Sequence, residues 1–154
     1  MLHDVSDEPP ANPAIDMRPS TYERFAEHPL GTLGLWSTAA DFARFGQMLL
    51  NGGALDGVRI LSPASVQLMA TNQAGTLYPQ PGQGFGLGFS IVERLGADNS
   101  LMSEGSYGWG GAYGSQYRID PAERVIVVFM LNQIPNRSDV AAKFPTLVYQ
   151  ALVR

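Results

Sequence analysis

The chain has 154 residues, of which 45% are hydrophobic, and a formal net charge of −4. This length supports one domain with a hydrophobic core, and the negative charge argues against nucleic acid as a partner. The sequence contains no cysteine, which excludes disulfides, thiolate metal sites and a cysteine nucleophile. Only 16% of the residues are charged, and there are 17 glycines and 11 prolines. Together these values indicate a loop-rich chain that exposes apolar surface, which another segment or chain would have to cover.

Residues 1–30 are rich in proline and show no apolar periodicity, so we expect an irregular segment ahead of an α/β portion at 31–154. The start of the chain leads into acidic residues instead of a basic stretch and an apolar run. We therefore expect no secretory signal, with the cytoplasm slightly favoured. The longest apolar run, Val125 to Leu131, is too short to span a bilayer.

Two helices are predicted in the first half of the chain. The first covers about 38–50, where Ser37 or Thr38 can act as the N-cap and two glycines follow the last turn. The second covers about 63–70, because Ser62-Pro63 supplies an N-cap serine followed by proline at the first helical position.

Three strands and a helix are predicted in the second half. Alternation of apolar residues with Gly or Ser predicts a strand over 85–91, and a second covers about 110–119. A third, over 125–132, is apolar on both faces and is expected to be central. These elements predict an α+β fold, an antiparallel sheet flanked by helices. A final helix covers 139–154, with Pro145 expected to kink it. Its buried stripe is expected to contain Val140, Phe144, Leu147, Val148, Ala151 and Leu152.

The most distinctive segment is 106–115, in which glycine and serine account for six of the ten residues around Trp109. Dense glycine inside a strand pattern sacrifices side-chain packing and backbone entropy. We therefore expect another group to approach the backbone closely there.

Trp109-Gly110-Gly111 resembles the third active-site motif of the serine β-lactamase, penicillin-binding protein and esterase superfamily. In most members that motif reads Lys or His, then Thr or Ser, then Gly. Further blocks match in the same order and extend the resemblance over roughly residues 30 to 154: Gly34–Phe45, Gly52-Gly53, Ile60–Pro63, Gly84–Phe89, and Asp120-Pro121 with the C-terminal helix. The resemblance implies the C-terminal part of the β-lactamase/transpeptidase-like fold, in the esterase-like branch related to class C β-lactamases.

The resemblance also implies roles for residues of this segment. The backbone N–H of Ala112 matches the family's oxyanion donor, and the glycines before it leave that backbone unobstructed. Trp109 replaces a cationic or imidazole residue with a neutral indole, which favours neutral acyl esters over carboxylate-bearing β-lactams or D-Ala peptides. For the aromatic residues, simple packing on the sheet is the alternative. The candidate substrate-binding residues are Trp109, Gly110, Gly111, Tyr107 and Tyr113.

The family's Ser-x-x-Lys nucleophile motif is absent, because the single lysine, Lys143, has Val140 three residues before it. Tyr113-Gly114-Ser115 fits the second motif, Tyr-x-Ser, but lies inside the third-motif segment and is discounted. His3 and His28 are expected to be surface residues. No metal-ligand spacing or dinucleotide loop is present, so neither a metal nor a cofactor is expected.

Two interpretations remain open. In the first, the chain is the C-terminal part of an esterase-type serine hydrolase for a small ester or amide, and a missing N-terminal half supplies the nucleophile. In the second, it is an inactive binding or structural module that self-associates through its sheet edge or complements an N-terminal half. β-Lactamase or D-Ala peptidase activity remains an alternative within the family. The isolated chain is expected to be inactive.

Overall fold

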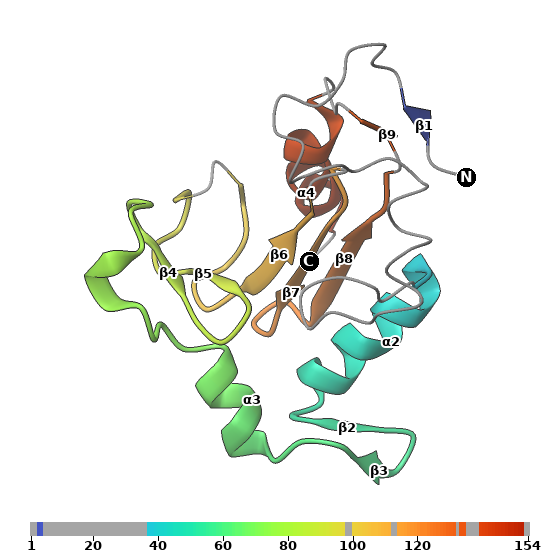
Figure 1. The fold of residues 1–154 in the computed structure, drawn as a ribbon, viewed down its shortest axis with the longest axis vertical. Helices are drawn as coiled ribbons and strands as arrows, with labels where there is room; N and C mark the ends of the chain where they lie inside the picture. The colour runs from blue at the N-terminus through green and yellow to red at the C-terminus, as the bar shows by residue number, and fades with distance from the viewer. Residues whose placement is uncertain are drawn as a thin grey trace.

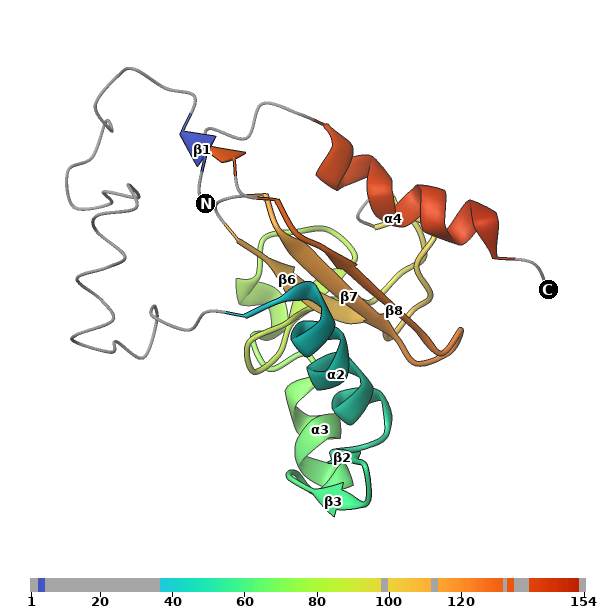
Figure 2. The same cartoon turned by 90° about the vertical axis from the view of Figure 1, so that its right-hand side faces the viewer.

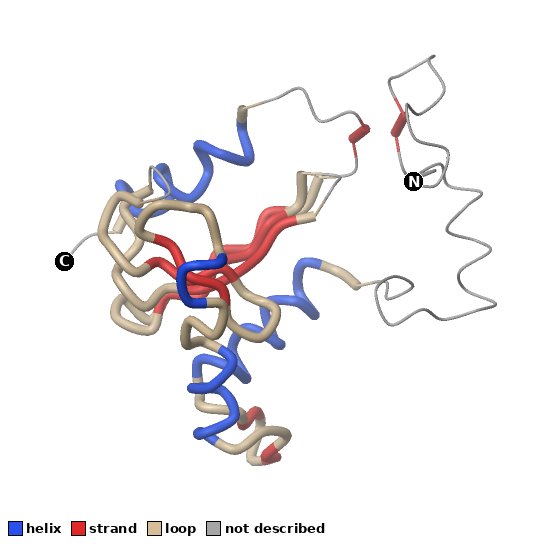
Figure 3. The backbone as a smooth tube through the Cα atoms, turned by 60° about the vertical axis from the view of Figure 1, so that its left-hand side comes forward, coloured by secondary structure: helices blue, strands red, loops and turns tan. Residues whose placement is uncertain are grey.

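The computed structural model describes residues 3–4, 37–97, 100–111, 114–131, 133–134 and 139–152. Within these residues the chain has an α+β fold, as predicted. A five-stranded antiparallel sheet lies between helix α2 on one face and helix α4 on the other (Figures 1 and 2). Figure 3 shows the strands as one layer between these helices. The predicted boundary between 1–30 and 31–154 lies outside the described residues.

The central sheet follows chain order, so each strand pairs with the next. Its strands are β4 (Gln83–Phe85), β5 (Ser90–Val92), β6 (Tyr107–Gly110), β7 (Gln116–Asp120) and β8 (Val125–Phe129). Two short strand pairs lie outside it. They are β2 (Ala54–Leu55) with β3 (Val58–Arg59), antiparallel, and β1 (His3–Asp4) with β9 (Gln133–Ile134), parallel.

Helices α2 (Ala39–Leu50) and α3 (Pro63–Met69) confirm the two helices predicted in the first half. The side chains of Thr38 and Ser62 accept backbone amide hydrogens of the first turns, at 3.1 and 3.0 Å. Each cap therefore satisfies an N–H group that has no partner inside its helix. The two helices and the sheet enclose the main core, which consists of Met48, Leu49, Val66, Phe89, Ile91, Tyr107 and Ile119.

Two of the predicted strands are wrong because each contains a turn. The segment 85–91 is a hairpin: Gly86 donates its N–H to the Phe89 carbonyl at 2.8 Å, and Gly88 has φ +93°. The segment 110–119 likewise spans the end of β6, a glycine-containing loop and the start of β7. Glycine at alternate positions imitates the two-residue period of a strand, which conceals the turn.

Strand β8 was predicted to be central, and this is wrong. It is the last strand of the sheet and pairs only with β7 among the described strands. Its two apolar faces have another cause, since α2 contacts β8 on one side and α4 on the other. Phe129 of β8, for example, packs against Phe144 of α4 with ring centroids 5.0 Å apart. A strand that is apolar on both faces needs both faces covered. An edge strand meets this condition when a helix packs on each face.

Helix α4 (Val140–Ala151) exists as predicted, but its buried face is rotated from the predicted one. Val140, Leu147 and Leu152 are exposed. The residues at least partly buried are spaced by three or four positions, as one helical face requires. They are Ala141, Phe144, Pro145, Val148 and Tyr149, with Thr146 at the margin.

Pro145 lies inside α4 and the helix continues through it. Proline has no N–H, so the carbonyl of Ala141, four residues earlier, loses its usual helical partner. The side-chain amide of Gln116, on β7, donates to that carbonyl instead. The buried proline is therefore tolerated because the sheet supplies the missing hydrogen bond.

Candidate functional site

Strand β6 carries the motif residues of the proposed site. Trp109 pairs with Tyr117 and Gly110 with Gln116 of β7, which fixes the backbone of the motif. The Trp109 side chain is 42% exposed. Its ring packs edge-on against Phe85 of β4, with centroids 4.9 Å apart and an interplanar angle of 86°. Trp109 thus presents an indole surface held on one side by another ring.

The glycines of this sheet fall into two groups. A Cβ at Gly84, Gly86 or Gly108 would lie 2.6 Å or less from another atom of the chain: Asn72 Cγ, the Met69 carbonyl oxygen or the Tyr117 carbonyl oxygen. These three glycines are required by close packing. A Cβ placed at Gly110 or Gly111 would lie 3.4 or 4.0 Å from the nearest described atom, the Ser115 carbonyl oxygen. Neither residue has a left-handed φ. Neither backbone strain nor packing of the described chain requires glycine there.

The hairpin loop after β6 is closed by backbone hydrogen bonds. Gly111 donates to the Ser115 carbonyl at 2.8 Å, and Gly114 donates to the Gly111 carbonyl at 3.0 Å. Ala112 and Tyr113 lie outside the described residues. The oxyanion role of the Ala112 amide and the substrate contact of Tyr113 therefore stay predictions.

Tyr107 lies at the other end of β6 and is only 3% exposed. Its ring packs against Phe89 with centroids 5.2 Å apart, and burial raises the pKa of its phenol to about 12. The structure places Tyr107 beneath the motif as part of the core, which corresponds to the packing alternative.

No described serine is arranged as a nucleophile beside a base. Ser106 is fully buried. The Ser115 hydroxyl donates to the Leu131 carbonyl at 2.9 Å and accepts from the Leu131 amide at 3.1 Å, so it ties two strands together. Lys143 is exposed on α4 and pairs with Asp139 in the preceding turn. None of these three side chains is therefore placed as an activated nucleophile or its base.

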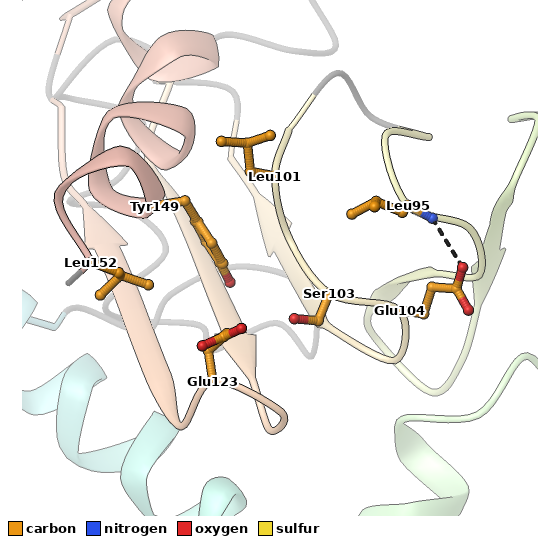
Figure 4. Close-up of a pocket in the computed structure, with 7 residues that line it drawn as sticks. All are labelled: Leu95, Leu101, Ser103, Glu104, Glu123, Tyr149 and Leu152. Atoms are coloured by element: carbon orange, nitrogen blue, oxygen red, sulfur yellow. Dashed lines mark hydrogen bonds between the residues drawn. The ribbon is translucent and has the colours of Figure 1, made fainter. Parts of the chain in front are cut away.

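A cavity of about 720 Å³ lies beside the start of β6, at the opposite end of the strand from Gly110. Figure 4 shows Tyr149 of α4 projecting between Glu123 and the 101–104 loop. None of the predicted site residues lines it. Its lining consists of Leu95, Leu101, Ser103, Glu104, Glu123, Tyr149 and Leu152.

Asp120, beside this cavity, is a buried hydrogen-bond centre that the sequence indicated only through the Asp120-Pro121 block. Its carboxylate accepts from the backbone amides of Ser103, Ala122 and Glu123 at 3.0 to 3.1 Å and from the Tyr149 hydroxyl at 2.5 Å. Burial alone would raise the pKa of Asp120, but these hydrogen bonds outweigh it and hold the pKa below its usual value. Burial and the bond to Asp120 raise the pKa of Tyr149. The group joins β7, α4 and the loop before β6.

In the part of the chain that the structure describes, no three His, Asp or Glu side chains gather in a way that would hold a metal ion. None of the described helices is both long and apolar enough to cross a membrane.

The motif strand and the fold agree with comparisons to known proteins. Protein Rv1367c of Mycobacterium tuberculosis is 40% identical over 121 residues, covering 71% of this chain and 30% of that protein. Penicillin-binding protein 4 of Amycolatopsis lactamdurans is 31% identical over 158 residues, covering 99% of this chain and 36% of that protein. The chain thus spans about a third of the length of the curated relatives it matches.

Several solved structures have a similar fold. EstCE1, a hydrolase with promiscuous acyltransferase activity, has a TM-score of 0.61 and 26% identity, covering 75% of this chain and 29% of that one. Simvastatin synthase (LovD) from Aspergillus terreus has a TM-score of 0.67 over 89% of this chain and 40% of its own, and at 21% identity it supports the fold alone. The family model described as Beta-lactamase matches residues 2–151. The predicted resemblance is therefore confirmed: this chain belongs to the Beta-lactamase family of serine hydrolases.

Proposed function

We propose that this chain is the C-terminal part of an esterase-type serine hydrolase that acts through an acyl-serine intermediate. In this proposal the chain supplies one wall of the active site, formed by Trp109, Gly110 and Gly111, and an oxyanion donor at the Ala112 amide. The remainder of the protein supplies the Ser-x-x-Lys nucleophile. The substrate is a small neutral ester.

The observation that carries the proposal is the open backbone at Gly110 and Gly111. Elsewhere in the sheet, Gly84, Gly86 and Gly108 make room for other parts of the same chain. Gly110 and Gly111 make room for none of the described residues, although they follow Trp109 at the end of an otherwise ordered strand. A backbone face that no described residue crowds suits a substrate carbonyl that must come within hydrogen-bond distance of a backbone amide.

The choice of an ester follows from the side chains near the motif. Trp109 offers a neutral indole where a cation would attract a carboxylate. The nearby guanidinium of Arg118 donates to the backbone carbonyls of Trp109 and Tyr117, at 3.1 and 2.8 Å, and so faces the strand. EstCE1, which is similar in fold and 26% identical, is a hydrolase with acyltransferase activity. Both reactions pass an acyl group through the enzyme, which supports an acyl-serine mechanism.

The first test uses the chain alone. We expect no hydrolysis of p-nitrophenyl butyrate or nitrocefin and no labelling by a fluorophosphonate, because Ser106 is buried and the Ser115 hydroxyl is engaged. Turnover abolished by Ser106→Ala or Ser115→Ala would overturn the proposed location of the nucleophile.

The second test joins the chain to a nucleophile. The chain is co-expressed with the part of EstCE1 that this match leaves uncovered, and association is checked by co-purification. The complex is expected to hydrolyse p-nitrophenyl butyrate in preference to nitrocefin. Gly111→Val should remove most of this activity, by about a hundredfold, since blocking one oxyanion donor has an effect of that size. Ala151→Val, exposed at the end of α4, adds comparable bulk as a control. Equal activity of the two variants would refute the role of the Gly111 backbone.

A second candidate function is a non-catalytic module that self-associates. The outer edge of β8 pairs with no described strand, and Val140 and Leu147 are exposed on α4, the helix that contacts β8. An open edge next to apolar surface favours strand addition by another chain. Sedimentation velocity of the chain alone distinguishes the cases, because a monomer at high concentration contradicts self-association.

A further inference from the structure

Three aromatic rings form a continuous row that begins at the motif tryptophan. Trp109 packs against Phe85 at 4.9 Å, and Phe85 packs against Tyr78 at 5.3 Å between ring centroids. The pairing of β5 with β6 stops at Ser90, the first residue of β5, which lies opposite Gly108. Trp109 is the next residue of β6, so the Trp109 ring reaches β4 without β5 between them. The row therefore runs from the proposed active-site strand to the outermost strand of the sheet, whose order is visible in Figure 1.

The row is held in place by backbone contacts made by its central residue. The Phe85 carbonyl accepts hydrogen bonds from the amides of Gln73 and Ala74, at 2.8 and 3.0 Å. The Phe85 amide and the Gly75 amide both donate to the side-chain oxygen of Asn72, at 3.3 and 2.9 Å. The loop that leads to Tyr78 is thus fastened to β4 at Phe85, and the rings are positioned before any ligand arrives.

The surface of the row is apolar and partly open to solvent. Trp109 is exposed, and the other two rings are half-buried. Leu77 and Leu87, which adjoin the row in sequence, are both strongly exposed. The three rings carry no charge, so they offer a hydrocarbon group favourable contact.

We propose that Tyr78, Phe85 and Trp109 form a subsite for the hydrocarbon part of a neutral ester, preferably an arylalkyl acyl group. This inference rests on the proposed function, because the ester carbonyl must lie at Gly110 and Gly111 for the attached group to reach Trp109. It adds Tyr78 and Phe85 as specificity-determining residues and Asn72 as a positioning residue. The two ring spacings allow a phenylbutyryl group to lie along the row, whereas an acetyl group ends before reaching Phe85.

The binding test uses the chain alone, so that it does not depend on catalysis. Trp36→Phe removes the only other tryptophan and leaves Trp109 as the fluorophore. Methyl 4-phenylbutyrate is expected to change Trp109 emission saturably, and methyl acetate is not. Phe85→Leu should weaken the phenylbutyrate ester about tenfold, since it removes the central ring. Phe129→Leu makes the same change on β8, where the ring packs against α4, and should have no effect on binding.

Saturable binding that Phe85→Leu weakens and Phe129→Leu leaves alone supports the subsite. No response to the phenylbutyrate ester, equal weakening by both variants, or an emission change that follows chain concentration without ester would each overturn it. Failure of the EstCE1 complex to hydrolyse any ester would instead reject the proposed function, whatever the binding result.

In an active complex, the kinetic readout is the ratio of kcat/KM for p-nitrophenyl 4-phenylbutyrate to that for p-nitrophenyl acetate. Phe85→Leu and Asn72→Ala should each lower this ratio, the first by about tenfold. A variant that merely disturbed the fold would lower both values together and leave the ratio unchanged, which would contradict the assignment.

Discussion

The two ends of strand β6 differ in what they contact. At its start, buried Tyr107 and Ser106 lie close to Asp120, whose carboxylate accepts four hydrogen bonds from three segments of the chain. At its end, Gly110 and Gly111 meet no crowding from the described chain. The first end is filled by contacts within the chain, whereas no described residue crowds the second. In the proposed function, the structural and catalytic roles therefore belong to opposite ends of this strand.

The largest expected effect comes from breaking the closed end. Asp120→Ala leaves three backbone amides and the Tyr149 hydroxyl without their buried acceptor. We expect a loss of about 3 kcal/mol in the free energy of unfolding, since each buried unsatisfied donor is destabilising. Urea denaturation measures it. A loss below about 1 kcal/mol would mean that water replaces the carboxylate and that the two ends do not differ as described.

The same group predicts how stability depends on pH. The folded pKa of Asp120 lies below its ordinary value of 3.8, so its contribution is complete above that value and is lost as the pH falls through the folded pKa. The Tyr149 pKa is raised, so its contribution is complete below the ordinary value of 10.0 and is lost as the pH rises above it. Asp120→Asn should flatten the acid limb of the stability profile, and Tyr149→Phe the alkaline limb. Unchanged limbs would contradict these assignments.

Two glycines of β6 and its extension allow a matched comparison. Gly108→Ala places a Cβ 2.1 Å from the Tyr117 carbonyl oxygen, so the β6–β7 pair must move apart. We expect a loss of about 2 kcal/mol in unfolding free energy, as for other overpacked sites. Gly111→Ala meets no described atom closer than 4.0 Å, and we expect a change within about 0.5 kcal/mol. Equal losses at the two positions would show that Gly111 is needed for folding.

Local signals in the sequence predicted the elements that local chemistry decides. Thr38 and Ser62 cap their helices as expected, because an N-cap hydrogen bond involves only neighbouring residues. The family and the α+β class also followed from the sequence, since several short blocks occurred in a fixed order.

Features that depend on distant contacts were less predictable. The apolar faces of β8 indicated burial but not whether strands or helices cover the strand. Gly86 was predicted to be a strand residue, whereas it lies between β4 and β5, where its lack of a side chain makes room for the Met69 carbonyl of the preceding helix. The sequence did not indicate Asp120 as a buried hydrogen-bond centre, because its partner Tyr149 lies 29 residues away. For the candidate site, the sequence located the motif on β6, and the row from Trp109 to Tyr78 became visible only once β4 was placed.

The smallest expected effect concerns Gln116, which lies opposite Gly110 at the open end but is tied to α4. Its side chain donates to the Ala141 carbonyl that Pro145 leaves without a helical partner. Gln116→Leu should lower the free energy of unfolding by about 1 kcal/mol, the usual net value of such a hydrogen bond. In a Pro145→Ala background the new N–H at position 145 can reach the same carbonyl, so the Gln116→Leu change should lose most of its effect. A double-mutant cycle by urea denaturation measures this coupling. Additive losses would mean that Gln116 does not compensate for the proline, whereas a clear coupling would show that the Gln116 side chain replaces the missing helical hydrogen bond and ties α4 to β7.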